Sequence, residues 1–249
     1  MKNRAVFTVL FFLVVLVAVV IRGGRLDLRP MHHDEANQAV KFGLLLEKGE
    51  YTYDPVDHHG PTLYYLTLPF AWISSGTSFE NLSESTLRLV PVLFGIAILL
   101  LLLVFKSGMS KSAKIFAGLI YAVSPVMVFF SRFYIQEILL LFFMTGAIAS
   151  GWRYYKKPSS SWAVVTGLFV GLMYATKETC VILFGAMAGA LALEFFIARD
   201  IVETLLNPGL EDIIILVVLV LLRTLLAFFI DYEIRHIPKK QLHKVFKKN

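Results

Sequence analysis

The sequence predicts an all-α, polytopic membrane protein with six or seven transmembrane helices and a long first loop that carries interfacial helices. Hydrophobic residues make up 57% of the 249 residues, against roughly 45–50% in soluble domains. They are concentrated in long runs, and the basic residues stand at the ends of those runs and in the C-terminal tail. This pattern is typical of membrane topology and does not favour binding of nucleic acid, despite the net charge of +6.

The first apolar run covers residues 5–21 and contains a single polar residue, Thr8. At about 1.5 Å per residue, such a run, extended by flanking residues in the interface, spans a hydrocarbon core of about 30 Å. Lys2 and Arg4 precede it. A cleaved signal peptide would have a shorter apolar region and small residues at a cleavage site, which the segment after residue 21 does not offer. We therefore expect an uncleaved anchor.

A long polar loop follows at residues 22–85 and contains nine of the 18 acidic residues. Within it, residues 62–73 are apolar but too few to cross a membrane. We expect a helix there that lies at the interface, with Tyr64, Tyr65 and Trp72 as interfacial aromatics.

Further apolar runs predict the remaining spans, near residues 87–105, 113–130, 138–155, 162–176, 179–198 and 211–230. The connectors that follow residues 105 and 155 are short and basic, which places them in the cytoplasm with the N-terminus. Alternation then brings the loop 22–85, the turn 131–137 and the turn 176–179 to the extracytoplasmic face. The sequence thus predicts a multi-pass protein of the cell membrane whose three polar segments meet at one outer surface.

The last predicted span fits this scheme poorly. An outward-going helix at 211–230 would leave the tail 235–249 outside, although the tail carries six Lys/Arg and no acid. Arg223 in the middle of that span is also costly without a partner. A re-entrant turn within 199–210, a wrongly placed span and a missing native context all remain open explanations.

The adjacent carboxylates Asp34 and Glu35 have two interpretations. They begin a segment with the pattern of a helix, in which Asp34 is a good N-cap and acidic residues suit the first turn. Alternatively, a carboxylate at the membrane surface acts as a general base, for which it must reach an incoming hydroxyl or amide.

Histidines in the same loop raise the possibility of a divalent metal ion, with His58, His59 and Glu137 as its ligands. Their spacing matches no compact metal motif, and a polar loop at the level of the lipid headgroups is the alternative. Glu137 directly precedes an apolar run, where an unpaired carboxylate is expensive, so we expect it to have a partner or a chemical role. Lys177 either binds a lipid phosphate or forms an ordinary pair in the turn.

The order of these motifs resembles a known superfamily. One span is followed by "DE", then by a long loop with "GPTLYYL", by "SRFYIQE" between the third and fourth spans, and by "TK" after the fifth. This order resembles the GT-C glycosyltransferases, which use polyprenyl-phosphate sugars. The chain is similar to the protein O-mannosyltransferases and aminoarabinose transferases, and more so to a flippase-activity-associated family linked to protein glycosylation. The resemblance covers about residues 1–200 and leaves 201–249 poorly matched.

The resemblance implies an inverting transfer of a sugar from a polyprenyl-phosphate donor to a protein or lipid-linked acceptor. It implies that Asp34, or Glu35 beside it, is the catalytic base. Glu137 corresponds to a second acid near the acceptor or a metal. One base is enough for direct displacement of a good leaving group, without the second catalytic carboxylate of a retaining glycosidase.

The resemblance also implies which residues hold the donor phosphate. Lys177 corresponds to a phosphate-binding lysine, and Arg132 assists it. His59, in "HGP", stands where the aminoarabinose transferases have a Lys-Pro-Pro stretch, and it supplies a weaker contact to phosphate than lysine does.

Relatives of this kind have about eleven or more spans, so two other functions stay open. The chain can be a non-catalytic subunit or a fragment that works with a partner subunit. It can also be a flippase for a lipid-linked sugar, although a flippase needs polar residues along a path through the bilayer, and the predicted spans are mostly apolar with charges at one rim.

Overall fold

The computed structural model describes residues 2–54, 59–186 and 188–189. The chain divides into two units, Met1–Val181 and Ile182–Asn249. The helices of the first unit are, in chain order, α1 (Lys2–Gly23), α2 (His33–Lys48), α3 (Thr62–Ser74), α4 (Glu84–Val104), the 3-10 helix η1 (Lys106–Gly108), α5 (Lys111–Val123), α6 (Pro125–Ser131), α7 (Glu137–Lys156) and α8 (Ser160–Thr176). The predicted all-α class is confirmed. The span near 211–230, the basic tail and residues 190–198 of the span near 179–198 lie outside the described residues.

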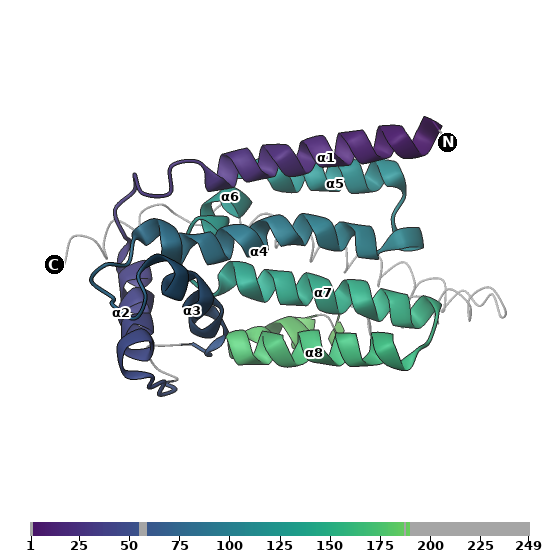
Figure 1. Ribbon diagram of the computed structural model, residues 1–249. Helices are drawn as coiled ribbons and strands as arrows, with labels where there is room; N and C mark the ends of the chain where they lie inside the picture. The colour runs from purple at the N-terminus through teal and green to yellow at the C-terminus, as the bar shows by residue number, and fades with distance from the viewer. Residues whose placement is uncertain (1, 55–58, 187, 190–249) are drawn as a thin grey trace, which may run out of the picture. The chain divides into compact units, whose positions relative to one another are not determined.

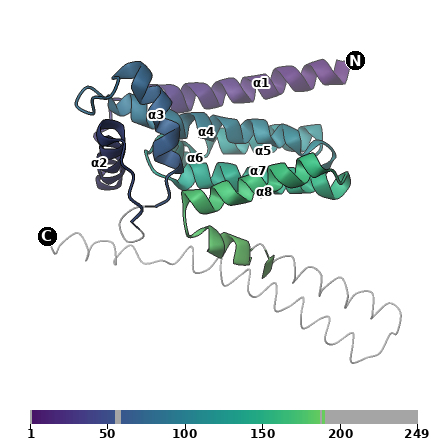
Figure 2. The ribbon, with the colours of Figure 1, turned by 60° about the horizontal axis from the view of Figure 1, so that its bottom comes forward.

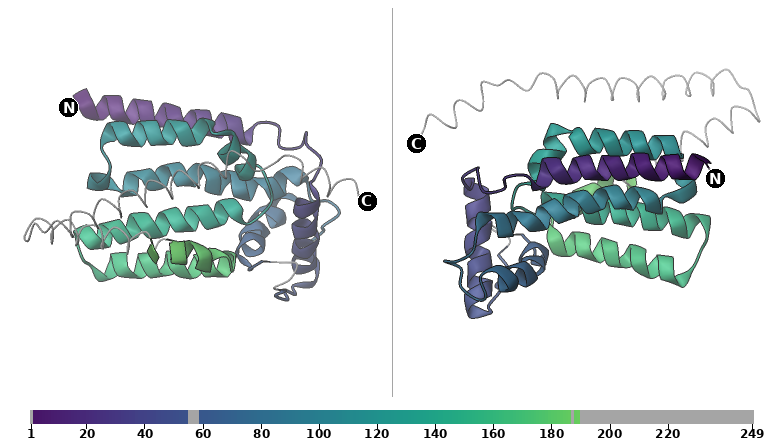
Figure 3. Two further views of the ribbon diagram at one scale, coloured as in Figure 1. Left: turned by 180° about the vertical axis from the view of Figure 1, so that it is seen from behind. Right: turned by 45° about the horizontal axis from the view of Figure 1, so that its top comes forward.

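Helices α1, α4, α5, α7 and α8 lie lengthwise beside one another, and α2 crosses one end of them (Figure 1). Helix α7 packs against both α4 and α8, and α1 packs against α5. Figures 2 and 3 show the same neighbours from other sides. We call the end with α2 and α3 the acidic end. The opposite end, where residues 105–110 and 157–159 join helices, we call the connector end.

Two helices in the described part of the chain are long and apolar enough to cross a membrane: Arg4–Gly23 and Glu84–Val104. The bent pair α5–α6 would make a third span, and the apolar helix α8 is shorter. The predicted spans near 138–155 and 162–176 thus form helices α7 and α8, but neither counts as a span by length and composition. The structure supports an integral membrane protein, and the orientation stays a prediction.

The predicted span near 113–130 is not one straight helix. It breaks at Ser124 into α5 and α6, which are bent by 66°. Ser124 is extended, with φ −59° and ψ 121°, and Pro125 follows it as the first residue of α6. A proline disfavours the helical conformation of the residue before it and lacks the N–H that would continue the helix, so the sequence itself explains the break.

Arg22, near the end of α1, is fully buried and binds carbonyl groups that have no helical partner at this break. Its guanidinium donates to the carbonyl oxygens of Tyr121 at 3.0 Å and Ala122 at 2.9 Å, and to Ser131 Oγ at 3.2 Å. These carbonyls end α5 and have no helical partner of their own. Arg22 therefore caps α5 and ties the bend to α1.

Arg132, just after α6, makes the reciprocal contact with the end of α1. Its guanidinium donates to the carbonyl oxygens of Ile21 at 2.9 Å, Gly24 at 2.8 Å and Arg25 at 3.1 Å. The two arginines thus cap each other's helices, which fixes the position of the 131–137 segment relative to α1.

Replacing Arg22 with Met should lower the free energy of unfolding by about 2 kcal/mol or more, because buried carbonyls lose a charged donor. Arg25→Met is the control, since the Arg25 side chain is exposed. The measurement is unfolding in mixed micelles under increasing denaturing detergent. Equal stability of the two variants would show that the capping contacts contribute little.

Candidate active site

The three polar segments predicted to meet do come together, at the acidic end. Segment 131–137 contacts the start of α2 through a bond from the Tyr134 N–H to Glu35. The turn after α8 contacts the start of α7 through Lys177 and Glu137, and the segment before α3 through His59 and Glu178. In Figure 1 the ends of α1 and α8 and the starts of α4 and α7 face α2 and α3.

Glu35 is the centre of this end, and its side chain is fully buried. Arg88 of α4 pairs with both oxygens, with Nε at 3.0 Å from Oε1 and Nη2 at 3.1 Å from Oε2. Arg29 adds a bond of 2.6 Å to Oε2. Backbone N–H groups complete the set, from Tyr134 to Oε1 at 2.9 Å and from His32 to Oε2 at 3.1 Å. One carboxylate therefore joins α2, α4, the loop after α1 and the segment before α7.

These bonds also determine the charge of Glu35. Burial acts to raise the pKa of the Glu35 carboxyl, but hydrogen bonds from Arg88 and from the Tyr134 and His32 N–H groups outweigh it and hold the pKa below its ordinary value. Glu35 therefore stays ionised at neutral pH and has no free oxygen for an incoming group.

Asp34, the neighbour of Glu35, is in a different environment. Its side chain is 62% exposed, and its Oδ2 lies 3.3 Å from His32 Nδ1. Successive residues of a helix point about 100° apart, so the turn that buries Glu35 directs Asp34 outward. Of the two predicted base candidates, only Asp34 can be reached from outside in this conformation.

The predicted helix is present and both acids lie in its first turn, but the predicted N-cap, Asp34, is wrong by two residues, because His32 is the N-cap of α2. The His32 side chain accepts a bond from the Asp34 N–H at 3.3 Å, and the Glu35 carboxylate accepts one from the His32 N–H. The two residues thus form a capping box with histidine in place of the usual Ser or Thr. A preference for aspartate at N-caps could not anticipate this.

The segment "GPT" at 60–62 packs closely against the end of α8. The Gly60 N–H donates to the Thr176 carbonyl at 3.2 Å, and Thr62 Oγ1 donates to Thr176 Oγ1 at 2.8 Å. A Cβ at position 60 would collide with the carbonyl of Ala175. Glycine is therefore required for this approach, which brings residues 59 and 178 into contact.

Lys177 and Glu137 form a close ion pair, with Nζ and Oε1 2.6 Å apart. Glu137 is the first residue of α7, where the helix dipole favours a negative charge. Its second oxygen, Oε2, is buried with no hydrogen-bond partner. The expectation that Glu137 needs a partner is confirmed, and the partner is the lysine predicted to bind phosphate.

His59 is held by Glu178, which the sequence analysis did not select. His59 Nδ1 lies 3.1 Å from Glu178 Oε2, and Tyr53 Oη donates to Glu178 Oε1 at 2.6 Å. The hydrogen bond to Glu178 raises the pKa of Tyr53 to about 12. Burial acts to raise the pKa of Glu178, but the bonds from Tyr53 and His59 leave it below the ordinary value. Glu178 thus holds the imidazole of His59 at its Nδ1 edge.

The described residues do not gather a metal site. No three His, Cys, Asp or Glu side chains among them form a group that could hold an ion. Glu137 faces the ammonium of Lys177 and His59 faces Glu178, while His58 lies outside the described residues. We therefore derive no chemical step through a metal.

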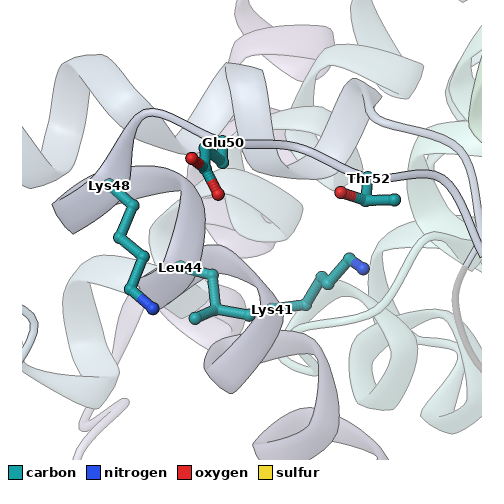
Figure 4. Close-up of a pocket in the computed structure, with 5 residues that line it drawn as sticks. All are labelled: Lys41, Leu44, Lys48, Glu50 and Thr52. Atoms are coloured by element: carbon teal, nitrogen blue, oxygen red, sulfur yellow. The ribbon is translucent and has the colours of Figure 1, made fainter.

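A small pocket of about 160 Å³ lies beside α2, lined by Lys41, Leu44, Lys48, Glu50 and Thr52 (Figure 4). The two lysines come from α2 and the last two residues from the segment after it. None of these residues belongs to the predicted site, so the pocket marks a separate, polar part of the acidic end.

Sequence reasoning missed Arg88 and Arg22, since each lies within or beside an apolar run. A signal was nonetheless present, because an arginine in such a run is costly unless a carboxylate or a set of carbonyls receives it. The prediction that Tyr64 is an interfacial aromatic is wrong, because Tyr64 is fully buried in a polar group with Gln38 and Gln136 that the sequence analysis missed. Gln136 Nε2 donates to Gln38 Oε1 at 2.9 Å, and Tyr64 Oη donates to the same oxygen.

Comparisons with known proteins support the fold. A chain of the S. cerevisiae protein O-mannosyltransferase Pmt1–Pmt2 complex bound to the sugar donor is similar in structure, with a TM-score of 0.60 and 18% sequence identity. The match covers 91% of this chain and 34% of that chain. A family model described as a protein of unknown function, DUF1622, matches residues 184–234. No curated protein matches the sequence.

At this identity the likeness shows the fold alone: the chain has a GT-C-like fold. It spans about a third of the length of the O-mannosyltransferase chain. The family model covers a short C-terminal stretch, most of which lies outside the described residues.

Replacing Glu35 with Gln should lower the free energy of unfolding by about 2–3 kcal/mol, because the buried Arg88 then keeps only the partly exposed Glu84 carboxylate, 3.0 Å away, as its counter-charge. The matched control is Asp34→Asn, which removes the same charge one residue away and should change stability by no more than about 0.5 kcal/mol. Detergent-induced unfolding measures both. Similar losses in the two variants would contradict the different environments.

Acid should destabilise the chain through Glu35. Since its pKa is lower in the folded chain than the ordinary 4.5, this carboxylate stabilises the fold fully above that pH, and the contribution is lost as pH falls toward the folded-state pKa. The stability difference between wild type and Glu35→Gln should therefore shrink as pH is lowered from about 5 to about 3. Unfolding measured across that range tests this, and a constant difference would contradict it.

Proposed function

We propose that this chain is a membrane glycosyltransferase module that moves a sugar from a polyprenyl-phosphate donor to a hydroxyl or amide of a protein or lipid-linked acceptor. Two findings support this. The fold is GT-C-like, and the structural neighbour is a protein O-mannosyltransferase. One end of the helices combines an exposed carboxylate with a lysine and a histidine held by carboxylates.

The observation that carries the proposal is the difference in environment between Asp34, which is exposed, and Glu35, which is buried and fully hydrogen-bonded. Glu35 is a positioning residue, because its oxygens are occupied by Arg88, Arg29 and two N–H groups. Asp34 is the base, because the same helix turn presents it to the outside. The acceptor oxygen or nitrogen attacks the anomeric carbon as Asp34 takes its proton, the bond from that carbon to the phosphate oxygen breaks, and the configuration inverts.

Lys177 and His59 are the groups that we assign to the donor phosphate. The negative charge of the departing polyprenyl phosphate needs a nearby cation, which Lys177 supplies as a point charge. Its partner Glu137 holds the ammonium at the start of α7 until phosphate arrives. We assign no phosphate contact to Arg132, because its guanidinium already donates to three carbonyl oxygens at the end of α1.

A partner subunit is part of the proposal. The neighbour is a complex of two proteins, and this chain spans about a third of the neighbouring chain. The same observation favours a second candidate function, in which the chain is a non-catalytic subunit. A flippase is less well supported, because the ion pairs of the described residues all involve acidic residues at one end of the helices.

The test uses the full chain in liposomes with radiolabelled mannose on a polyprenyl phosphate and a peptide rich in Ser and Thr. Asp34→Asn should reduce transfer by about 100-fold or more, the usual contribution of a general base, while the chain stays folded. Asp27→Asn is the matched control, because Asp27 is an exposed acid of the same loop.

Equal transfer by the two variants would contradict the role of Asp34. If the folded wild-type chain binds the donor but transfers no label, the subunit function is favoured instead. Lys177→Gln should weaken donor binding, which binding of the labelled donor measures separately from transfer.

A further inference from the structure

The connector end carries a compact group of cations and aromatic rings, which we call the connector-end cluster: Trp152, Arg153, Tyr155 and Lys156 of α7 and Trp162 of α8. The guanidinium of Arg153 lies over the Trp162 ring at 4.9 Å from its centroid. The ammonium of Lys156 lies over Trp152 at 4.7 Å and over Tyr155 at 5.5 Å. The rings themselves contact each other, with the Trp152 and Tyr155 centroids 5.9 Å apart.

These cations have no anionic partner within the described part of the chain. None of the ion pairs formed there includes Arg153, Lys156 or Lys157. The sequence explains why, because residues 85–136 and 138–177 contain no Asp or Glu. At the acidic end, in contrast, Arg29, Arg88 and Lys177 all pair with carboxylates.

We propose that the connector-end cluster is a binding site for the phosphate of an anionic phospholipid, with Arg153 and Lys156 as the cations and the aromatic rings as its platform. This inference goes beyond the proposed glycosyl transfer and does not depend on it.

Charge and composition together favour a lipid as the occupant. Contacts with ring faces hold the two cations in place, and no carboxylate of the described residues takes the N–H donors that a phosphate would accept. Tyr155 is 73% exposed, and Trp and Tyr are the residues that favour the membrane–water interface. The cluster lies where α7 ends and α8 begins (Figure 1), and α8 is an apolar helix. A lipid headgroup therefore meets the cluster as its acyl chains meet the helix.

The experiment uses the tryptophans of the chain as reporters. The sequence has three, and Trp72 belongs to α3 at the opposite end. Trp72→Phe leaves only Trp152 and Trp162, which report on the cluster. The full chain is placed in bilayers of phosphatidylcholine with a fixed fraction of phosphatidylglycerol. Bromine, which quenches tryptophan fluorescence on contact, is placed on either lipid at equal mole fraction.

We expect stronger quenching by brominated phosphatidylglycerol than by brominated phosphatidylcholine in the Trp72→Phe chain. Adding Arg153→Gln and Lys156→Gln should remove this preference. Loss of each cation should lower the relative affinity for phosphatidylglycerol roughly fivefold, which corresponds to about 1 kcal/mol per basic residue near an anionic membrane surface. The exchange Arg153→Lys with Lys156→Arg retains both charges and should retain the preference.

Lys41→Gln with Lys48→Gln is the matched control, because it removes the same charge from the α2 pocket of Figure 4. This variant should keep the preference. Equal quenching by the two brominated lipids would overturn the proposal. So would a preference that survives loss of Arg153 and Lys156, or one that disappears with Lys41 and Lys48 or in the charge-retaining exchange.

Discussion

The buried carboxylate of Glu35 is the interaction on which the acidic end depends. An ionised group inside a protein is tolerated only when nearly all of its acceptor positions are filled. Here two arginines and two backbone N–H groups fill them. The donors come from three stretches of chain, namely the segment before α2, helix α4 and the segment before α7, so the position of α2 is set by its neighbours. The exposure of Asp34 is a consequence, because it lies one residue earlier on the same helix.

Among the described residues, every ion pair lies at the acidic end. The acidic end pairs Arg29, Arg88 and Lys177 with its own carboxylates and leaves Asp34 exposed beside His32. The connector end has cations over aromatic rings, and none of the described carboxylates pairs with them. At the acidic end an incoming phosphate would compete with Glu137 for Lys177.

The helices and the meeting of three polar segments could be predicted because long apolar runs alternate with charged ones. Residue type alone could not distinguish Asp34 from Glu35, since both are acids in a first helical turn and only burial separates them. Pro125 indicated the break at Ser124, but the continuous apolar run around it led to the prediction of one straight span. The partners of Glu35 and Glu178 lie up to 125 residues away in sequence, so their pairing requires the tertiary structure. The orientation in the membrane and the roles of Glu137 and His59 stay predictions.

A double-mutant cycle between Glu35 and Arg88 tests the central claim most directly. The free energy of unfolding would be measured for wild type, Glu35→Ala, Arg88→Ala and the double variant. If the buried pair holds the acidic end together, the two losses should be strongly non-additive, with a coupling energy of about 2 kcal/mol or more. A coupling energy near zero, with each loss simply adding to the other, would contradict the account.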